Sequence, residues 1–191
     1  MAKKGTKYQI VDLGTHFVKA AVLEAQGGAF SISSAAAVPL RGLATDADGY
    51  LTELSQGFGD LADFFDRKTP IFFLCNESLA RVGVAYLNNL PSGGVDDALT
   101  AERTKFISSF GTTSYEQTVA NSFKLREKAQ GKAVQVVAAN VYAKVDHIDV
   151  LFDLCSSRKL TFGGAYPRLF AYNELFKMCF GGDPAALSSV A

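Results

Sequence analysis

Near its N-terminus the chain has two apolar segments of β-strand type, joined by one short turn. The first segment ends in Asp12-Leu13-Gly14-Thr15, and the second begins at Phe17 and contains Lys19. Gly14 permits a close backbone approach or a positive φ angle, and the amides of such a turn can form an anion-binding nest. Asp12, at the strand end, is placed to hold a hydrated Mg²⁺, which keeps several waters and takes one or two carboxylates. The pattern predicts a phosphate-binding hairpin, to which Thr15 adds a hydroxyl.

A plain hairpin accounts for the same residues. Asp12 is then a turn-forming residue and Lys19 a solvated strand residue. The two interpretations differ in the expected effect of Asp12→Ala. At a ligand site this change should leave folding nearly intact, because a strand-end carboxylate contributes little packing, whereas marked unfolding favours the plain hairpin.

Charge and hydropathy exclude several classes of function. The chain has 191 residues, enough for one domain or two small subdomains, with 19 Lys and Arg against 19 Asp and Glu. This neutral balance gives no reason to expect nucleic acid or an anionic membrane surface as a partner. Residues 1–4 lead into a strand pattern instead of a signal peptide, and apolar runs such as residues 71–75 are too short to span a bilayer. We therefore expect a cytoplasmic chain with no nucleic-acid partner and no direct membrane insertion.

The cysteines and histidines offer no alternative catalytic centre. Cys75, Cys155 and Cys179 lie far apart in the sequence, and each follows an apolar residue. They are expected to be buried free thiols in a reducing compartment. His16 and His147 are also far apart, so neither a metal site nor a Ser/His/Asp triad is indicated.

The order of elements in the first half is that of the N-terminal half of a ribonuclease-H-like subdomain. The alternation and spacing of apolar residues predict strands over residues 7–13, 17–25 and 29–39, an amphipathic helix between Leu51 and Phe65, and a strand over residues 71–75.

The second half contains an α+β pattern followed by a return to the first subdomain. Its expected elements are a strand over residues 82–91, a helix over 95–110, a hairpin of 118–125 with 133–142, a helix over 145–155, a strand over 160–162 and a helix over 166–180. On the helix at 145–155, Phe152 is expected to share an inward face with Leu151 and Cys155. Short strands interleaved with helices predict a mixed α/β fold.

The hairpin resembles the first phosphate loop of the actin, Hsp70 and sugar-kinase superfamily of ATPases. Lys19 lies where actin-like proteins often carry a lysine that meets the β- and γ-phosphates. A second unit inserted into the first subdomain resembles FtsA of cell division and, more closely, the PilM family of type IV pilus assembly. The segment from Asp12 to Ala21 is near the PilM hairpin pattern, and the Leu90-Pro91 strand end also matches. The resemblance covers residues 7–178.

The resemblance implies an α/β, actin-like ATPase (ribonuclease-H-like) subdomain with an inserted α+β subdomain. The first subdomain is expected over residues 5–76 and 158–180, the insert over 77–157, and a flexible tail over 181–191. Asp12, Gly14, Thr15 and Lys19 would form the nucleotide and phosphate site, with Mg²⁺ held by Asp12 through water.

The chain departs from its resemblance in one respect. Actin-like ATPases clamp nucleotide between two halves, and the second half opens with another strand-Asp-x-Gly hairpin, which this sequence lacks. It is expected to be either a shortened chain or a naturally one-lobed relative. Because a ligand must bury most of its surface to be held, ATP and Mg²⁺ are expected to bind weakly or not at all, and no catalytic activity is expected.

The PilM resemblance implies a cytoplasmic scaffold at the inner face of the inner membrane. Its partner would be the short cytoplasmic tail of a PilN-like inner-membrane protein, bound in a groove between the first subdomain and the insert. Tyr86, Leu87 and Asn88 are candidate contact positions, although core or plain surface explains them equally well. The alternatives are an ATP-binding ATPase or small-molecule kinase of the same superfamily, an FtsA-like division protein, and a related cytoplasmic domain of type II secretion.

Overall fold

The computed structural model describes residues 6–26, 29–42, 47–91, 93–109 and 117–171. These residues form two compact units. Unit 1 comprises the residues up to Asn76 and from Leu154 onward, and unit 2 is Glu77–Asp153. The predicted helix end at Phe110, and the predicted helix and tail beyond residue 171, lie outside the described residues.

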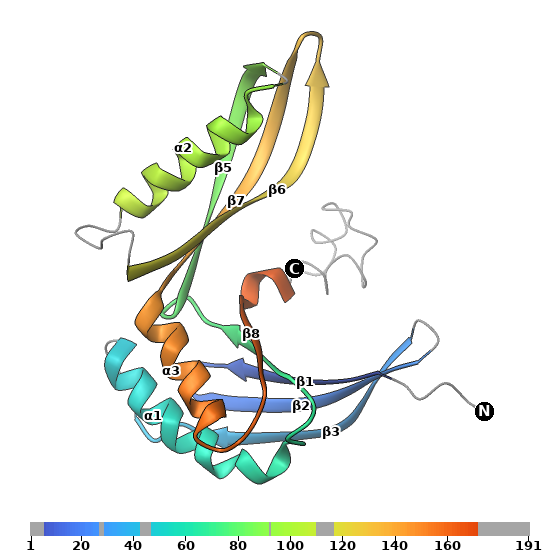
Figure 1. Ribbon diagram of the computed structural model, residues 1–191, viewed down its shortest axis with the longest axis vertical. Coiled ribbons are helices and arrows are strands. Elements are labelled where there is room, and N and C mark those ends of the chain that lie inside the picture. Colours follow the sequence, from blue (N-terminus) through green and yellow to red (C-terminus); the bar gives the residue numbers. More distant parts are fainter. Residues whose placement is uncertain (1–5, 27–28, 43–46, 92, 110–116, 172–191) are drawn as a thin grey trace, which may run out of the picture. The chain divides into compact units, whose positions relative to one another are not determined.

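Unit 1 is built on a five-stranded sheet with the order β3-β2-β1-β4-β8 (Figure 1). Its strands are β1 (Thr6–Leu13), β2 (Phe17–Gln26), β3 (Ala29–Pro39), β4 (Ile71–Cys75) and β8 (Phe162–Pro167). The first three form an antiparallel meander that ends at the edge strand β3, whereas β4 is parallel to β1 and β8 is parallel to β4. The predicted meander and the predicted strand at 71–75 are confirmed.

One face of this sheet carries the core of unit 1. Alternate residues of β1, Val11 and Leu13, are fully buried on this face. Helix α1 (Ala47–Asp60) packs on it and is followed by the 3₁₀ turn η1 (Ala62–Phe64). The Phe58 ring lies 5.7 Å from the ring of Phe73 on β4, centroid to centroid. The helix predicted up to Phe65 therefore ends at residue 60, and its apolar spacing continues through the 3₁₀ turn.

Unit 2 is a three-stranded antiparallel sheet with a helix on one face. The strand order is β5-β7-β6, and the elements are β5 (Ala80–Pro91), β6 (Thr118–Gln130), β7 (Ala133–Lys144) and helix α2 (Val95–Ser108). Figure 1 shows α2 lying along the sheet. The buried cluster between them contains Val95 of α2 and Val134, Val136 and Ala138 of β7. Helix α3 (Val145–Ser156) follows β7 and contains the boundary between the units.

Two local backbone features fix the strands of unit 2. Gly131 opens the tight turn between β6 and β7 with a φ of 64°, which the hairpin turn requires and glycine adopts without strain. The predicted hairpin around this turn is therefore confirmed, although β6 extends to Gln130 instead of ending at Leu125. In β5 the register shifts between Leu87 and Leu90, and Asn89 has a φ of 57°, a left-handed conformation that asparagine tolerates.

The structure corrects three predictions in the C-terminal part. The segment at 162–167 is strand β8, and a helical turn begins only at residue 168, whereas a strand at 160–162 and a helix from 166 were expected. The reason is close parallel packing on β4, since a Cβ on Gly163 would lie 2.9 Å from Phe72 Cε1. Phe152, expected to face inward on α3, is 53% exposed.

Candidate functional site

The predicted phosphate hairpin is the β1–β2 connection. The antiparallel register places Asp12 opposite Lys19 and Leu13 opposite Val18. Only Gly14, Thr15 and His16 connect the two strands. The sequence prediction that these residues form one tight hairpin is therefore correct, and Asp12, Gly14 and Lys19 lie together as expected.

Two backbone groups of this turn, the Gly14 amide and the His16 carbonyl, are hydrogen-bonded within the chain. The Gly14 amide donates both to the Asp12 carbonyl, at 3.1 Å, and to the Phe17 carbonyl, at 3.0 Å. The Leu40 amide donates to the His16 carbonyl at 2.8 Å. The Gly14 amide is thus engaged within the chain, whereas an anion-binding nest needs amides that point at the anion.

Steric packing explains why a glycine occupies position 14. A Cβ built there would lie 2.6 Å from the carbonyl oxygen of Phe17, a distance that real side chains do not tolerate. The Gly14 carbonyl also accepts a buried hydrogen bond of 3.0 Å from the hydroxyl of Tyr50 on α1. Burial raises the pKa of this tyrosine far above its usual value, so the hydroxyl stays a donor. The glycine is therefore required by the hairpin itself.

The carboxylate of Asp12 is neutralised by two basic side chains. Its Oδ1 lies 2.8 Å from Nε of Arg168, and its Oδ2 lies 3.8 Å from Nζ of Lys19. The side chains of Arg168 and Asp12 are 15% and 25% exposed, whereas that of Lys19 is 61% exposed. The buried Oδ1 and Nε atoms have no aligned hydrogen bond among the described residues, so their contact is a close ion pair. Arg168 also donates from Nη2 to the Leu13 carbonyl.

Arg168 was not predicted to belong to the site. It follows β8 directly, and the parallel strands β1, β4 and β8 bring their carboxyl ends to one edge of the sheet. The sequence signal that could have found it is a cation immediately after a third parallel strand. The predicted strand ends at residue 162 and the predicted helix begins at 166, so the sequence prediction does not place Arg168 after a strand.

The side chains around Asp12 do not fit a hydrated Mg²⁺. Such an ion keeps several waters and binds one or two carboxylates that are free to receive it. Here each carboxylate oxygen of Asp12 has a cation beside it. Thr15 and His16 are exposed at the tip of the turn.

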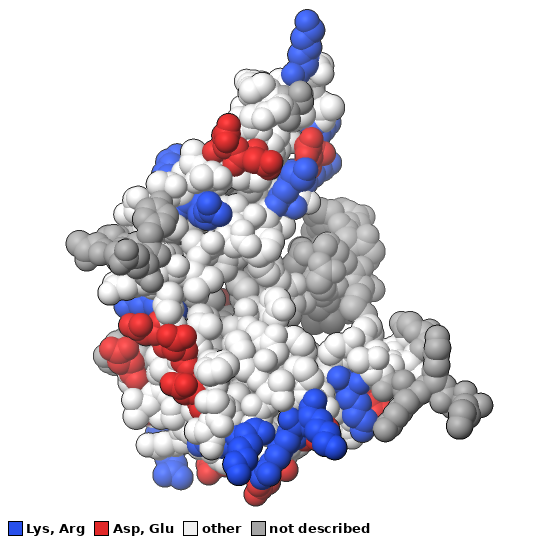
Figure 2. Space-filling view, in the orientation of Figure 1, with Lys and Arg blue, Asp and Glu red and all other residues white. Residues whose placement is uncertain are grey.

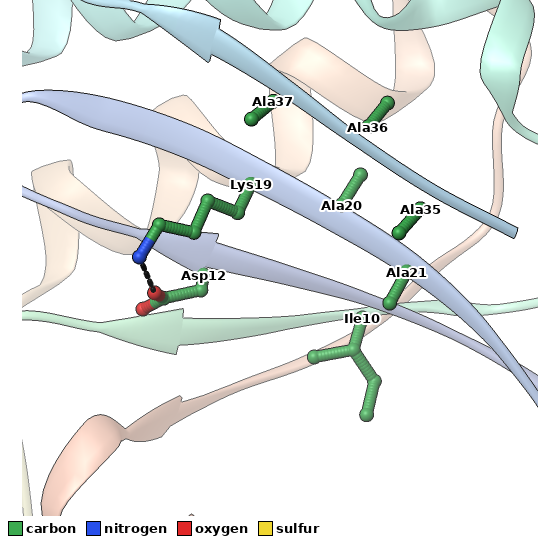
Figure 3. A pocket seen from close by; sticks show the side chains of 8 residues that line it. All are labelled: Ile10, Asp12, Lys19, Ala20, Ala21, Ala35, Ala36 and Ala37. Atoms are coloured by element: carbon green, nitrogen blue, oxygen red, sulfur yellow. Dashed lines mark ion pairs between the residues drawn. The ribbon is translucent and has the colours of Figure 1, made fainter. Parts of the chain in front are cut away.

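A groove of about 480 Å³ lies beside the ion pair on the sheet face opposite the core (Figure 3). Small side chains form most of its lining, with the Asp12–Lys19 pair at one side. The residues that line it are Ile10, Asp12, Lys19, Ala20, Ala21, Ala35, Ala36 and Ala37. Its lining is therefore largely apolar, with charge at the hairpin end.

The candidate partner positions of unit 2 divide between surface and core. Tyr86 is 70% exposed, while Leu87 packs against the buried cluster under α2. Asn88 accepts a hydrogen bond of 2.6 Å from the Gln135 side chain on the neighbouring strand. Only Tyr86 of the three offers a large exposed side chain.

Charge on the molecular surface is mixed. On the face drawn in Figure 2, Lys and Arg side chains form small groups that alternate with Asp and Glu. No helix in the described part of the chain has the length and apolar content needed to cross a bilayer.

Comparisons with known proteins give a result for the fold only. No protein-family model matches the sequence, and no curated protein matches it. Among solved structures, the PilM-PilN type IV pilus biogenesis complex matches with a TM-score of 0.64 and 14% identity, over 90% of this chain and 50% of that one.

A second match is the cytoplasmic domain of EpsL, an inner membrane component of the type II secretion system of Vibrio cholerae. Its TM-score is 0.51 at 10% identity, over 85% of this chain and 57% of that one. The chain thus spans between half and three fifths of these two structures. The resemblance to the PilM family is confirmed at the level of the fold: this chain has a mixed α/β fold shared with the PilM-PilN pilus structure and with the cytoplasmic domain of EpsL.

Proposed function

We propose that this chain is a PilM-like component of type IV pilus assembly that works as a scaffold by binding the short cytoplasmic tail of a PilN-like inner-membrane protein. The observation that carries this proposal is the match to the PilM-PilN complex over 90% of the chain. In this proposal the chain is cytoplasmic, reaches the inner face of the membrane through its partner, and turns over no substrate.

An apolar surface on unit 2 supports a role in binding protein. Several large apolar side chains on the outer strands are exposed. Four of them together are called the open face: Val84 (52%), Tyr86 (70%), Val119 (52%) and Phe123 (42%). Contiguous apolar surface of this kind marks interaction sites on soluble proteins. An apolar tail segment is the matching partner.

Strand register shows that these side chains share one face of the sheet. Val84 and Phe123 are both paired with Ala139 of the central strand β7. Their neighbours Gly83 and Ser122 contact α2, since a Cβ on Gly83 would meet the Phe106 ring and the Ser122 hydroxyl donates to the Leu99 carbonyl. The open face is therefore the side of the sheet opposite α2.

The experiment is a titration of the full chain with a fluorescently labelled peptide of a PilN-like cytoplasmic tail. Saturable binding is expected. The double variant Tyr86→Ser with Phe123→Ser should weaken binding by roughly tenfold or more, the usual effect of removing aromatic contacts at the centre of an interface. Phe30→Ser is the matched control, because Phe30 is 63% exposed but lies on β3 of unit 1. Absence of binding at high micromolar peptide contradicts the proposal.

A second candidate function is a cytoplasmic component of type II secretion. The likeness to the EpsL domain favours it, although with the lower TM-score of 0.51. The same titration with a cytoplasmic segment of a type II secretion inner-membrane protein separates the two. Tighter binding of that segment than of the pilus tail favours secretion.

A further inference from the structure

We propose that Arg168 is a built-in counter-ion that takes the place beside Asp12 which a divalent cation would need. The hairpin then has a structural role in unit 1, where it holds β1, β2 and the end of β8 together, and it is not a site for metal-bound nucleotide. This inference does not depend on the proposed partner, because it concerns the hairpin alone.

The register of the parallel strands places Arg168 next to Asp12. Asp12 of β1 is paired with Leu74 of β4, and Leu74 is paired with Tyr166 of β8. Arg168 stands two residues beyond Tyr166, at the same edge of the sheet as Asp12. Its Nη2 donation to the Leu13 carbonyl holds the guanidinium on the end of β1.

The positive charge of the Arg168 guanidinium opposes the binding of a divalent cation at Asp12. The guanidinium places a positive charge 2.8 Å from Asp12 Oδ1 and so balances the charge of that carboxylate. A divalent cation at the same oxygen would stand beside a fixed positive charge. The Nζ of Lys19, 3.8 Å from Oδ2, adds a second positive charge on the other side.

The Gly14 amide of the turn is also not free to face an anion. The Gly14 amide is divided between two carbonyls of the chain, and the glycine is explained by the 2.6 Å approach to the Phe17 oxygen. Each of the motif residues Asp12 and Gly14 therefore has an internal partner. In this proposal Asp12 and Gly14 serve to hold β1, β2 and the end of β8 together.

The first test is a double-mutant cycle by urea unfolding of the full chain, with Asp12→Asn, Arg168→Gln and the double variant. Each single change should lower the ratio of folded to unfolded chain by roughly tenfold, since it leaves a mostly buried charge unpaired. The double variant should be no less stable than the worse single one. Lys19→Gln is the control, and its exposed side chain predicts less than about a fivefold effect. Simple addition of the two single effects overturns the proposal.

The second test does not require the variants of Arg168 to fold. Amide NMR signals of the wild-type chain are recorded with added Mn²⁺, with and without ATP, and compared with those of Asp12→Asn. Paramagnetic broadening of the signals of Gly14, Thr15 and Lys19 should be the same in both proteins. Selective broadening in the wild type that Asp12→Asn abolishes would show a metal site and overturn the proposal. This outcome would not affect the proposed binding of the tail, which the peptide titration tests separately.

Discussion

The Gln9 side chain holds the backbone of Asp66 from both sides. Its Oε1 accepts from the Asp66 amide at 2.6 Å, and its Nε2 donates to the Asp66 carbonyl at 3.0 Å and to the Thr69 carbonyl at 2.7 Å. Gln9 is only 1% exposed, so no water replaces these bonds. One amide side chain of β1 thereby fixes the turn that leads into β4.

Gln9→Leu should destabilise unit 1 by about 3 kcal/mol, because it removes three hydrogen bonds of a buried side chain, each worth about 1 kcal/mol. Urea unfolding measures the change. Gln135→Leu is the matched control, since its bond to Asn88 is exposed, and it should cost less than about 1 kcal/mol. Equal effects of the two substitutions would contradict the role assigned to Gln9.

Gly14→Ala should destabilise the chain by about 2 kcal/mol, because the new Cβ would lie 2.6 Å from a backbone oxygen that cannot move away cheaply. Two other glycines serve as controls in the same thermal unfolding experiment. Gly93→Ala meets no atom within 4 Å and should be neutral. Gly131→Ala also meets none, but its φ of 64° should cost about 1 kcal/mol. If Gly14→Ala matches Gly93→Ala in stability, the steric explanation is wrong.

Asp66 should make stability depend on acid pH. The Lys68 amide, at 3.1 Å, and the Thr69 hydroxyl, at 2.9 Å, donate to its carboxylate and lower its pKa below the ordinary 3.8. A lowered folded-state pKa gives stability that is present above the unfolded pKa and lost as the pH falls through the folded pKa. The urea midpoints of the wild type and of Asp66→Asn should differ at pH 6. They should converge as the pH falls through the folded-state pKa of Asp66, which lies below the ordinary 3.8. A constant difference over this range would argue against the titration of Asp66.

Cys75 and Cys155 should resist alkylation in the folded chain. They are 2% and 1% exposed and are free thiols, as the sequence predicted, and burial raises the pKa of Cys75 to about 12 and that of Cys155 to about 11. Iodoacetamide at pH 8 followed by peptide mass spectrometry should modify neither residue until urea unfolds the chain. Modification in native buffer at the rate of the unfolded chain would show that these thiols are not buried.

The sign of the same pKa shifts gives a dependence at alkaline pH. The two thiols stay protonated in the folded chain but ionise in the unfolded chain near an ordinary pKa of about 8.5. Their burial therefore contributes stability below that value which declines as the pH rises through it. A Cys75→Ala, Cys155→Ala variant should have a flatter stability profile between pH 8 and 10, measured by urea unfolding. An unchanged slope would contradict this assignment.

Local sequence patterns were sufficient for the strands and the main hairpin. Alternating apolar residues fix β1, β2 and β3, and the short turn between β1 and β2 forces Asp12 opposite Lys19. Each of these features depends on residues close together in the chain, which is the range over which periodicity is informative.

The ion pair between Asp12 and Arg168 could not be predicted from such local patterns. Arg168 stands 155 positions after the Leu13 carbonyl to which it donates, and it arrives there through two parallel strand pairings. The predicted strand stopped at residue 162, yet the strand continues through Gly163, where close packing on Phe72 requires a glycine. The expectation that Asp12→Ala leaves folding nearly intact rested on the carboxylate alone, and the ion pair with Arg168 is a reason to expect a loss of stability instead.

The edge strand β3 has a consequence for the behaviour of the chain at high concentration. Its sequence, AFSISSAAAVP, contains no charged residue, and Phe30 and Ile32 are 63% and 67% exposed. Edge strands are normally protected from pairing with other chains by lysine, by an interior proline or by a covering element. Proline here stands only at the last position, Pro39. Self-association of this chain should therefore begin by strand addition at β3, and one lysine at Ser33 would be the smallest change that suppresses it.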